Sequence, residues 1–183
     1  MATRKRTVKQ TALDRELRGH LLRLDRLDHA LRSEWTATEF KDRALERKLT
    51  ALTTAGIAWL RDVIQEHGWP GHTLVGRAAA AAACRLVLHA ECSLTFHRQC
   101  LRRLQDAAAQ GEVPLQQVAY LTDVVRMRAG KKQLYGTKFR KVKGELVPYP
   151  IEKADAVDAR RKQMELPSLR TYARRLQRRY LPS

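Results

Sequence analysis

The segment RLVLHAECSLTFHRQC, residues 85–100, places two histidines and two cysteines in an otherwise apolar and basic run. On a continuous helix these side chains would share one broad face. A rise of about 1.5 Å per residue nevertheless separates His89 from Cys100 by roughly 16 Å, which is too far for both to hold one tetrahedral ion. The sequence contains no CxxC or HExxH motif that would complete such a site. We therefore expect no metal site.

His89 is the candidate for chemistry in this segment. It ends the apolar run AAACRLVL, where a buried helix should reach a polar rim. An imidazole in that position can exchange a proton with a substrate. The alternative is a histidine satisfied by hydrogen bonds at a helix end. We expect His97 to be partly exposed, and the cysteines to be small buried side chains, with Cys92 as a weaker candidate nucleophile.

A second candidate is the segment QLYGT, residues 133–137. Gly136 permits a backbone conformation that is closed to other residues. Such a turn can expose peptide N–H groups and direct the Tyr135 phenol and the Thr137 hydroxyl to one point, as a cradle for an oxyanion or a carboxylate. The alternative is that Gly136 is only a bulge in a hairpin.

Charge is the strongest compositional signal. The chain has a net charge of +17, and residues 131–183 hold fifteen Lys and Arg against five Asp and Glu, which is +10 of that total. Clustered basic side chains bind phosphates through counterion release. No sequence signature of a nucleic-acid-binding fold is present, so RNA or tRNA, an acidic peptide, a carrier protein and a merely solvated basic face all remain open. The predicted basic patch consists of Lys138, Arg140, Lys141, Lys143, Arg174, Arg175, Arg178 and Arg179.

The periodicity of apolar residues predicts a mainly α, single-domain helical bundle with one β-hairpin near residues 133–150. Residues 1–34 are interpreted as a basic arm with an amphipathic helix, and residues 35–183 as the helical core domain with its basic C-terminal helix. The second helix is expected to begin near Thr38 and to end at Gly68. Further helices are expected at 74–89, 94–110, 115–129 and 154–164, and after Pro167.

Several functional classes are disfavoured by the sequence. No apolar run approaches the ~20 residues of a membrane span, and the basic beginning lacks the apolar core of a secretory signal. Three cysteines cannot form a secreted-type disulfide framework, so we expect reduced thiols in a cytoplasmic protein. Because no cofactor or nucleotide motif is present, we predict no cofactor.

The ordered segments GWP, HAE, AYLTD, QLYGTKF, PYPIE and ARRKQMELPSL, with a VG before the alanine-rich helix, resemble a bacterial family, domain of unknown function 6624. The resemblance runs from about residue 59 to residue 172. It implies a small helical protein with a polar cluster. The cluster that it implies consists of His89, Asp123, Gln133, Tyr135, Gly136 and Thr137, with Arg126 and Arg161. Two departures from the family pattern are Val124, where members usually have Arg, and Lys138, where they usually have Gln.

Together these features predict a small, metal-independent enzyme. His89, Asp123 and Tyr135 form its expected catalytic set, with Asp123 orienting or pairing with His89 or Arg126. Gln133, Gly136, Thr137, Arg126 and Arg161 are the expected substrate-binding residues. The reaction could be hydrolysis, cyclisation or elimination of a polar or anionic substrate, including one carried on tRNA, a peptide or a carrier protein. The rival hypothesis is a non-catalytic basic module that binds RNA or an acidic protein.

Overall fold

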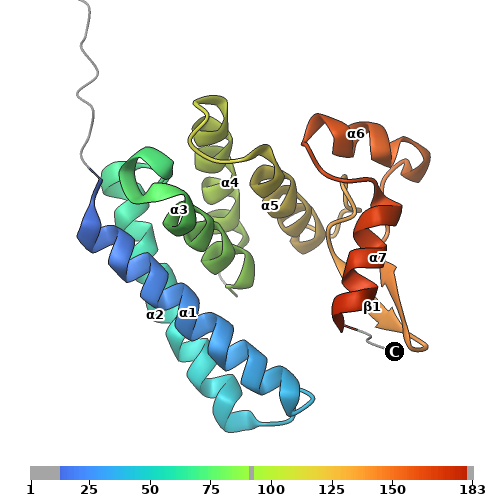
Figure 1. The fold of residues 1–183 in the computed structure, drawn as a ribbon, viewed down its shortest axis with the longest axis horizontal. Coiled ribbons are helices and arrows are strands. Elements are labelled where there is room, and N and C mark those ends of the chain that lie inside the picture. Colours follow the sequence, from blue (N-terminus) through green and yellow to red (C-terminus); the bar gives the residue numbers. More distant parts are fainter. Residues whose placement is uncertain (1–12, 91–92, 181–183) are drawn as a thin grey trace, which may run out of the picture.

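The computed structural model describes residues 13–90 and 93–180. In this part the chain is mainly α, with a single two-stranded antiparallel sheet, which confirms the predicted fold class (Figure 1). In the described residues, no helix is both long and apolar enough to cross a membrane. The elements are α1 (Arg15–Ala37), α2 (Arg43–His67), α3 (His72–His89), α4 (Leu94–Ala109), α5 (Leu115–Arg128), β1 (Phe139–Val142), β2 (Glu145–Pro148), η1 (Ala154–Ala156), α6 (Val157–Gln163) and α7 (Leu169–Tyr180).

The first two helices form a long pair beside the rest of the molecule (Figure 1). The expected start of the second helix at Thr38 is wrong, because Thr38 instead follows the last residue of α1. The N-cap of α2 is Asp42, whose carboxylate accepts hydrogen bonds from the first N–H groups of the helix. Gly68 ends α2 as predicted. The boundary proposed at residue 34 falls inside α1.

The alanine-rich helix α3 lies at the centre of the bundle. Ala79, Ala82 and Ala83 are fully buried, and their small side chains let neighbouring helices approach closely. Leu21 of α1 and Leu121 of α5 are fully buried in the same hydrophobic cluster. The central helix therefore has its apolar surface covered from two sides, and its last residue, His89, emerges at the edge of the core.

The segment at residues 85–100 is divided between two helices. Helix α3 ends at His89, and α4 begins after Ser93, whose hydroxyl accepts a hydrogen bond from the N–H of Phe96. A continuous helix is therefore the wrong description of this segment. His97 is buried, with 1% of its surface exposed, whereas we expected it to be partly exposed.

The predicted hairpin is present, with shorter strands than the expected range. Val142 pairs with Glu145 across a two-residue turn, in which Lys143 and Gly144 both have positive φ. This is the turn geometry that matches the twist of two antiparallel strands. The expected helix at 154–164 starts as the 3-10 turn η1 and continues as α6. The hairpin, α6 and α7 lie on the far side of α5 from α1 and α2 (Figure 1).

Candidate functional site

His89 is held by a buried carboxylate from α1. Its Nδ1 lies 2.6 Å from Oδ2 of Asp28, whose side chain is 3% exposed. Burial alone would raise the pKa of Asp28, but hydrogen bonds from His89 and Arg32 outweigh burial and lower that pKa. Since an ionised carboxylate only accepts hydrogen bonds, Nδ1 of His89 carries a proton. The lone pair of the neutral ring is therefore on Nε2.

Arg32 fixes both members of this pair. Its Nε lies 3.0 and 3.1 Å from the two carboxylate oxygens of Asp28, and its Nη2 donates to the carbonyl oxygen of His89 at 3.1 Å. The guanidinium thus anchors the end of α3 to α1, and it holds the Asp28 carboxylate ionised. We call Asp28, His89 and Arg32 the α1–α3 cluster.

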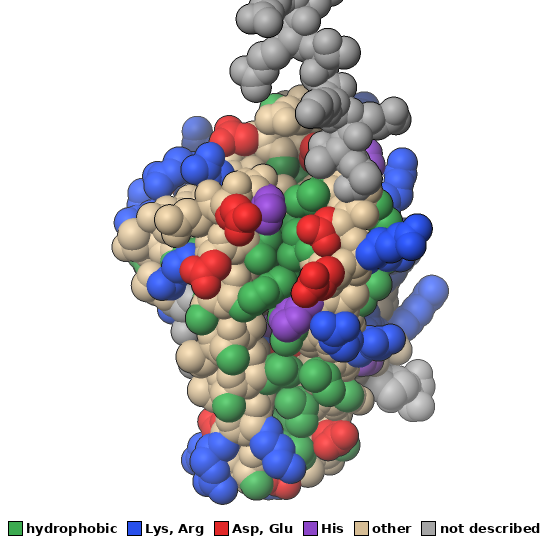
Figure 2. All heavy atoms as spheres, turned by 90° about the vertical axis from the view of Figure 1, so that its left-hand side faces the viewer, with side chains coloured by type: hydrophobic (Ala, Val, Ile, Leu, Met, Phe, Trp, Pro, Cys, Tyr) green, Lys and Arg blue, Asp and Glu red, His purple; other side chains and the backbone are tan. Residues whose placement is uncertain are grey.

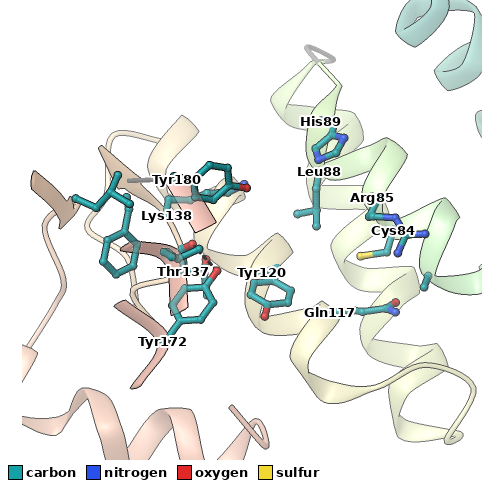
Figure 3. A pocket seen from close by; sticks show the side chains of 14 residues that line it. Cys84, Arg85, Leu88, His89, Gln117, Tyr120, Thr137, Lys138, Tyr172 and Tyr180 are labelled. Carbon is teal, nitrogen blue, oxygen red and sulfur yellow. Dashed lines mark hydrogen bonds between the residues drawn. The ribbon is translucent and has the colours of Figure 1, made fainter. Parts of the chain in front are cut away.

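His89 lines a cavity of about 650 Å³ between the helical core and the C-terminal elements (Figure 3). Helix α3 also contributes Cys84 and Arg85, α5 contributes Gln117 and Tyr120, and the far wall includes Lys138 and Tyr172. His89 also lines a second cavity of about 410 Å³, next to α2. The side chain is 36% exposed, and among the described residues Nδ1 contacts Asp28 while no hydrogen bond involves Nε2.

The groups that line the larger cavity differ in their protonation. Burial lowers the pKa of Lys138, although the Asp123 carboxylate opposes this effect. Burial raises the pKa of Tyr172 to about 12, and also raises that of Tyr120, which is hydrogen-bonded to Tyr172. Both phenols are therefore neutral hydrogen-bond donors at neutral pH. Burial raises the pKa of the Cys84 thiol to about 12, which makes this thiol a poor nucleophile.

Asp123 is placed elsewhere, at the centre of a closed network. It is fully buried on α5, and it accepts hydrogen bonds from the backbone N–H groups of Leu134, Tyr135 and Thr137 at 2.8, 3.1 and 2.9 Å. The Thr137 hydroxyl donates a fourth bond at 2.9 Å. The predicted cradle for a carboxylate therefore exists, but it is occupied by the chain's own carboxylate. The carboxylate that holds His89 is Asp28, not Asp123.

Gln133 and Gly136 of the QLYGT segment also stabilise the conformation of this loop. The Gln133 amide donates to the carbonyl oxygens of Lys138 and Tyr149 and accepts from the N–H of Lys138, so its side chain is fully used. Gly136 has a φ of +64°, and a Cβ there would lie 2.6 Å from Cδ1 of Ile151. Tyr135 is half-buried and does not line the larger cavity, whereas Thr137 does.

The two predicted arginines tie the C-terminal elements together. Arg126 donates to the carbonyl oxygen of Lys132 at 2.8 Å and pairs with Glu152. Arg161 is fully buried, donates to the carbonyl oxygens of Tyr135 and Pro167, and lies over the ring of Tyr172. Its Nη2 is buried without a hydrogen-bond partner. Neither arginine is among the residues that line the larger cavity.

His97 is a structural histidine. Its Nε2 lies 3.0 Å from the carbonyl oxygen of Val87, so Nε2 carries a proton, and Nδ1 accepts from Arg128 at 3.2 Å. Cys84 and Cys100 are buried as predicted, while Cys92 lies outside the described residues. In the ranges 13–90 and 93–180, no three His, Cys, Asp or Glu side chains gather as metal ligands would.

The predicted basic patch is mostly solvent-exposed. Seven of its eight side chains are exposed, and Lys138 is the exception because it lines the larger cavity. Helix α7 has no buried residue and packs near β2. In the described chain, no member of this patch forms a salt bridge with a carboxylate.

Asp28 and the cavity residues Tyr120 and Tyr172 were not predicted from the sequence as site residues. A signal for Asp28 was present, because it follows Leu17, Leu21 and Leu24 at helical spacing on the apolar face of α1. An acidic residue on an apolar face must find a buried partner, and Arg32 one turn later is one such partner. The pairing with His89, which is 61 residues away, has no local signal.

Residues 15–181 match the family described as "Family of unknown function (DUF6624)". No curated protein and no solved structure matches the chain significantly. The match spans all the helices and the hairpin, and it is the family that the ordered motifs indicated. The chain therefore belongs to this family of unknown function.

Proposed function

We propose that this chain is an acid/base enzyme, in which Nε2 of His89 exchanges a proton with an anionic substrate bound in the larger cavity. The observation that carries the proposal is the 2.6 Å contact between Nδ1 of His89 and the buried carboxylate of Asp28. A carboxylate in this position fixes the tautomer of the ring and stabilises the imidazolium that forms when Nε2 takes a proton.

The chemistry begins with removal of a proton by Nε2. In hydrolysis the proton comes from water, in cyclisation from a nucleophile within the substrate, and in elimination from a carbon atom. The imidazolium then returns the proton to the leaving group. Tyr120 and Tyr172 are neutral phenols hydrogen-bonded to each other, and the Tyr172 hydroxyl donates to the carbonyl oxygen of Thr137 at 3.4 Å. A phenol donates to negative charge that develops on a substrate oxygen by exchanging one of these partners for the substrate.

Reactivity toward diethyl pyrocarbonate tests the proposal without a known substrate. This reagent acylates unprotonated imidazole nitrogens, and peptide mapping gives the rate at each histidine. We expect His89 to react faster than His29, which is exposed on α1 and is the matched control. Asp28→Asn should slow the reaction at His89 but not at His29. A rate at His89 no greater than that at His29 would contradict the proposal, because the ring would then have no activated nitrogen.

A second candidate function is binding of an acidic polymer by the exposed basic patch. The observation that favours it is the absence of carboxylate partners for that patch within the described residues. Replacing the four arginines at positions 174, 175, 178 and 179 by glutamine should weaken tRNA binding and reduce its salt dependence. The same variant should leave the reactivity of His89 unchanged, so the two functions are separable.

A further inference from the structure

The larger cavity has a cationic side chain, Lys138, that forms no salt bridge with a carboxylate among the described residues. Lys138 follows the loop that Asp123 and Gln133 fix, and its side chain lies at the cavity wall opposite α3 (Figure 3). The cavity is lined by no Asp or Glu among the described residues. The arginine that also lines this cavity, Arg85, is already paired with both oxygens of Asp25, at 2.7 and 2.8 Å. Asp123 acts on Lys138 through space, but no carboxylate of the described chain contacts its ammonium group directly, so an anion in the cavity can take that contact.

The backbone of Lys138 is held rigidly, which makes its position a fixed feature of the cavity. Its N–H donates to Oε1 of Gln133 at 2.7 Å. Its carbonyl oxygen accepts from Nε2 of Gln133 at 3.1 Å and from the N–H of Tyr149 at 3.1 Å. Three hydrogen bonds to the N–H and the carbonyl oxygen of one residue hold its backbone and leave only the side chain to adjust. A binding group mounted in this way loses little conformational freedom when a ligand arrives.

The remaining walls fit an organic molecule rather than a bare inorganic ion. Leu88, Leu146 and Leu176 line the cavity with apolar surface, beside the rings of Tyr120 and Tyr172. A volume of about 650 Å³ lies in the range of sites for small molecules. A free phosphate ion would leave most of this apolar surface in contact with water.

Gln117 adds a second polar requirement. This residue lines the same cavity from α5, and its Oε1 is buried without a hydrogen-bond partner. A buried acceptor without a partner costs free energy that a ligand with an N–H or O–H group can recover. The cavity therefore presents a cation and an unpaired acceptor, separated by apolar and aromatic surface.

We propose that this cavity binds a small organic anion, whose carboxylate or phosphate group pairs with Lys138 and whose apolar body carries a hydrogen-bond donor for Gln117. This inference rests on the proposed function, because it names the substrate class for the cavity that His89 lines. The anion lies on the wall opposite α3, so the body of the molecule extends toward the imidazole.

Three probes test this proposal on the full chain by calorimetry and by chemical shifts of the Thr137 and Lys138 amides. Hippurate carries a carboxylate, an amide N–H and a phenyl ring. Phenyl phosphate carries the other anion without a donor in its body, and methyl hippurate is the neutral control. We expect hippurate or phenyl phosphate to bind and methyl hippurate to bind at least about tenfold more weakly.

Matched variants locate the anion. Lys138→Met removes the charge at nearly constant length, and it should weaken binding of the anions by about tenfold or more. Lys141→Met is the control, because Lys141 is exposed on β1 and does not line the cavity. It should change binding less than about twofold. Gln117→Leu should weaken binding of hippurate but not of phenyl phosphate, because only hippurate has a donor in its body.

Two outcomes overturn the inference. The first is binding that survives Lys138→Met unchanged, and the second is no shift of these amides with either anion at about 10 mM, a concentration that detects even very weak binding. Failure of the proposed function is distinguishable from both. Reactivity toward diethyl pyrocarbonate, measured without any ligand, tests His89 separately.

Discussion

Two buried carboxylates, Asp28 and Asp123, differ in what they hold. Asp123 accepts four hydrogen bonds, all from one loop of the chain, and its network is closed. Asp28 accepts from Arg32 and from His89, whose second ring nitrogen lies free at the edge of a cavity. The first arrangement can only stabilise the fold. The second arrangement can also polarise the His89 ring, whose Nε2 could contact a bound molecule.

Two histidines eight positions apart differ in the same way. His97 has its proton on Nε2, and both of its nitrogens have protein partners. His89 has its proton on Nδ1 and offers Nε2. A histidine is therefore better judged by its unused nitrogen than by its neighbours in the sequence. Four changes test this contrast between closed and open polar groups, from the largest expected effect to the smallest.

Asp123→Ala should have the largest effect on stability. It leaves three backbone N–H groups and a hydroxyl without their buried acceptor, each of which costs roughly 1–3 kcal/mol unless water enters. We expect a loss of at least about 3 kcal/mol and a fall of roughly 6–12 °C in the thermal midpoint. Hydrogen exchange should become faster at residues 134–137 before it does so in α3. An unchanged midpoint with slower acylation of His89 would contradict the assignment of Asp123 to structure.

His97 should make the fold sensitive to mild acid. Burial is the main cause that lowers its pKa below the ordinary value of 6.5 for histidine, and the charges of Arg128 and Lys138 act in the same direction, against the hydrogen bond to Val87. The unfolded chain therefore binds this proton at a higher pH than the folded chain. The contribution of His97 is fully present above about pH 6.5, and it is lost as the pH falls through the folded pKa.

Urea unfolding at pH 7.5, 6.5 and 5.5 measures this effect. His97→Gln should lower stability at pH 7.5 by about 1–3 kcal/mol, because it disturbs a buried pair of hydrogen bonds. It should also flatten the decrease in stability between pH 6.5 and 5.5. His29→Gln is the control and should change neither quantity, since His29 is exposed. An equal pH slope in the wild type and His97→Gln would show that the titration occurs elsewhere.

Cys84→Ala tests whether the Cys84 thiol, which lies on the cavity wall, takes part in the chemistry. The thiol is 2% exposed and its pKa is raised to about 12, so it should not react as a nucleophile at neutral pH. We expect a loss of about 1 kcal/mol from the small space left behind, with no change in the acylation rate of His89. A His89 rate that falls with this substitution would place the thiol in the reactive group.

The sequence was sufficient for the helices and the hairpin because their signals are local. Apolar periodicity, the glycines at positions 68 and 130 and the turn at Gly144 all act within a few residues. The second helix begins after Asp42 and not near Thr38, because both residue types cap helices and only the backbone between them decides which one does.

The candidate site could be predicted only in part, because some of its contacts are local in the sequence and others join distant helices. His89 and Thr137 do lie on one cavity, and the turn at Gly136 does direct N–H groups to one point. What fills that point depends on the packing of α5, and what holds His89 depends on α1, 61 residues earlier. Long-range pairing of polar side chains leaves no periodic pattern in a single sequence, so Asp28 could not be matched to its histidine.

His89→Gln should have the smallest effect on stability and the largest on reactivity. Arg32 still pairs with Asp28 in this variant, and the glutamine amide can donate to the same carboxylate, so no buried group is left without a partner. We expect a change of no more than about 0.5 kcal/mol, with a thermal midpoint within roughly 2 °C of the wild type. Turnover of a substrate should be lost, because glutamine cannot accept and return a proton as Nε2 does. If the midpoint instead falls as far as in His97→Gln while turnover persists, then His89 is a structural histidine too, and the contrast between the two sites disappears.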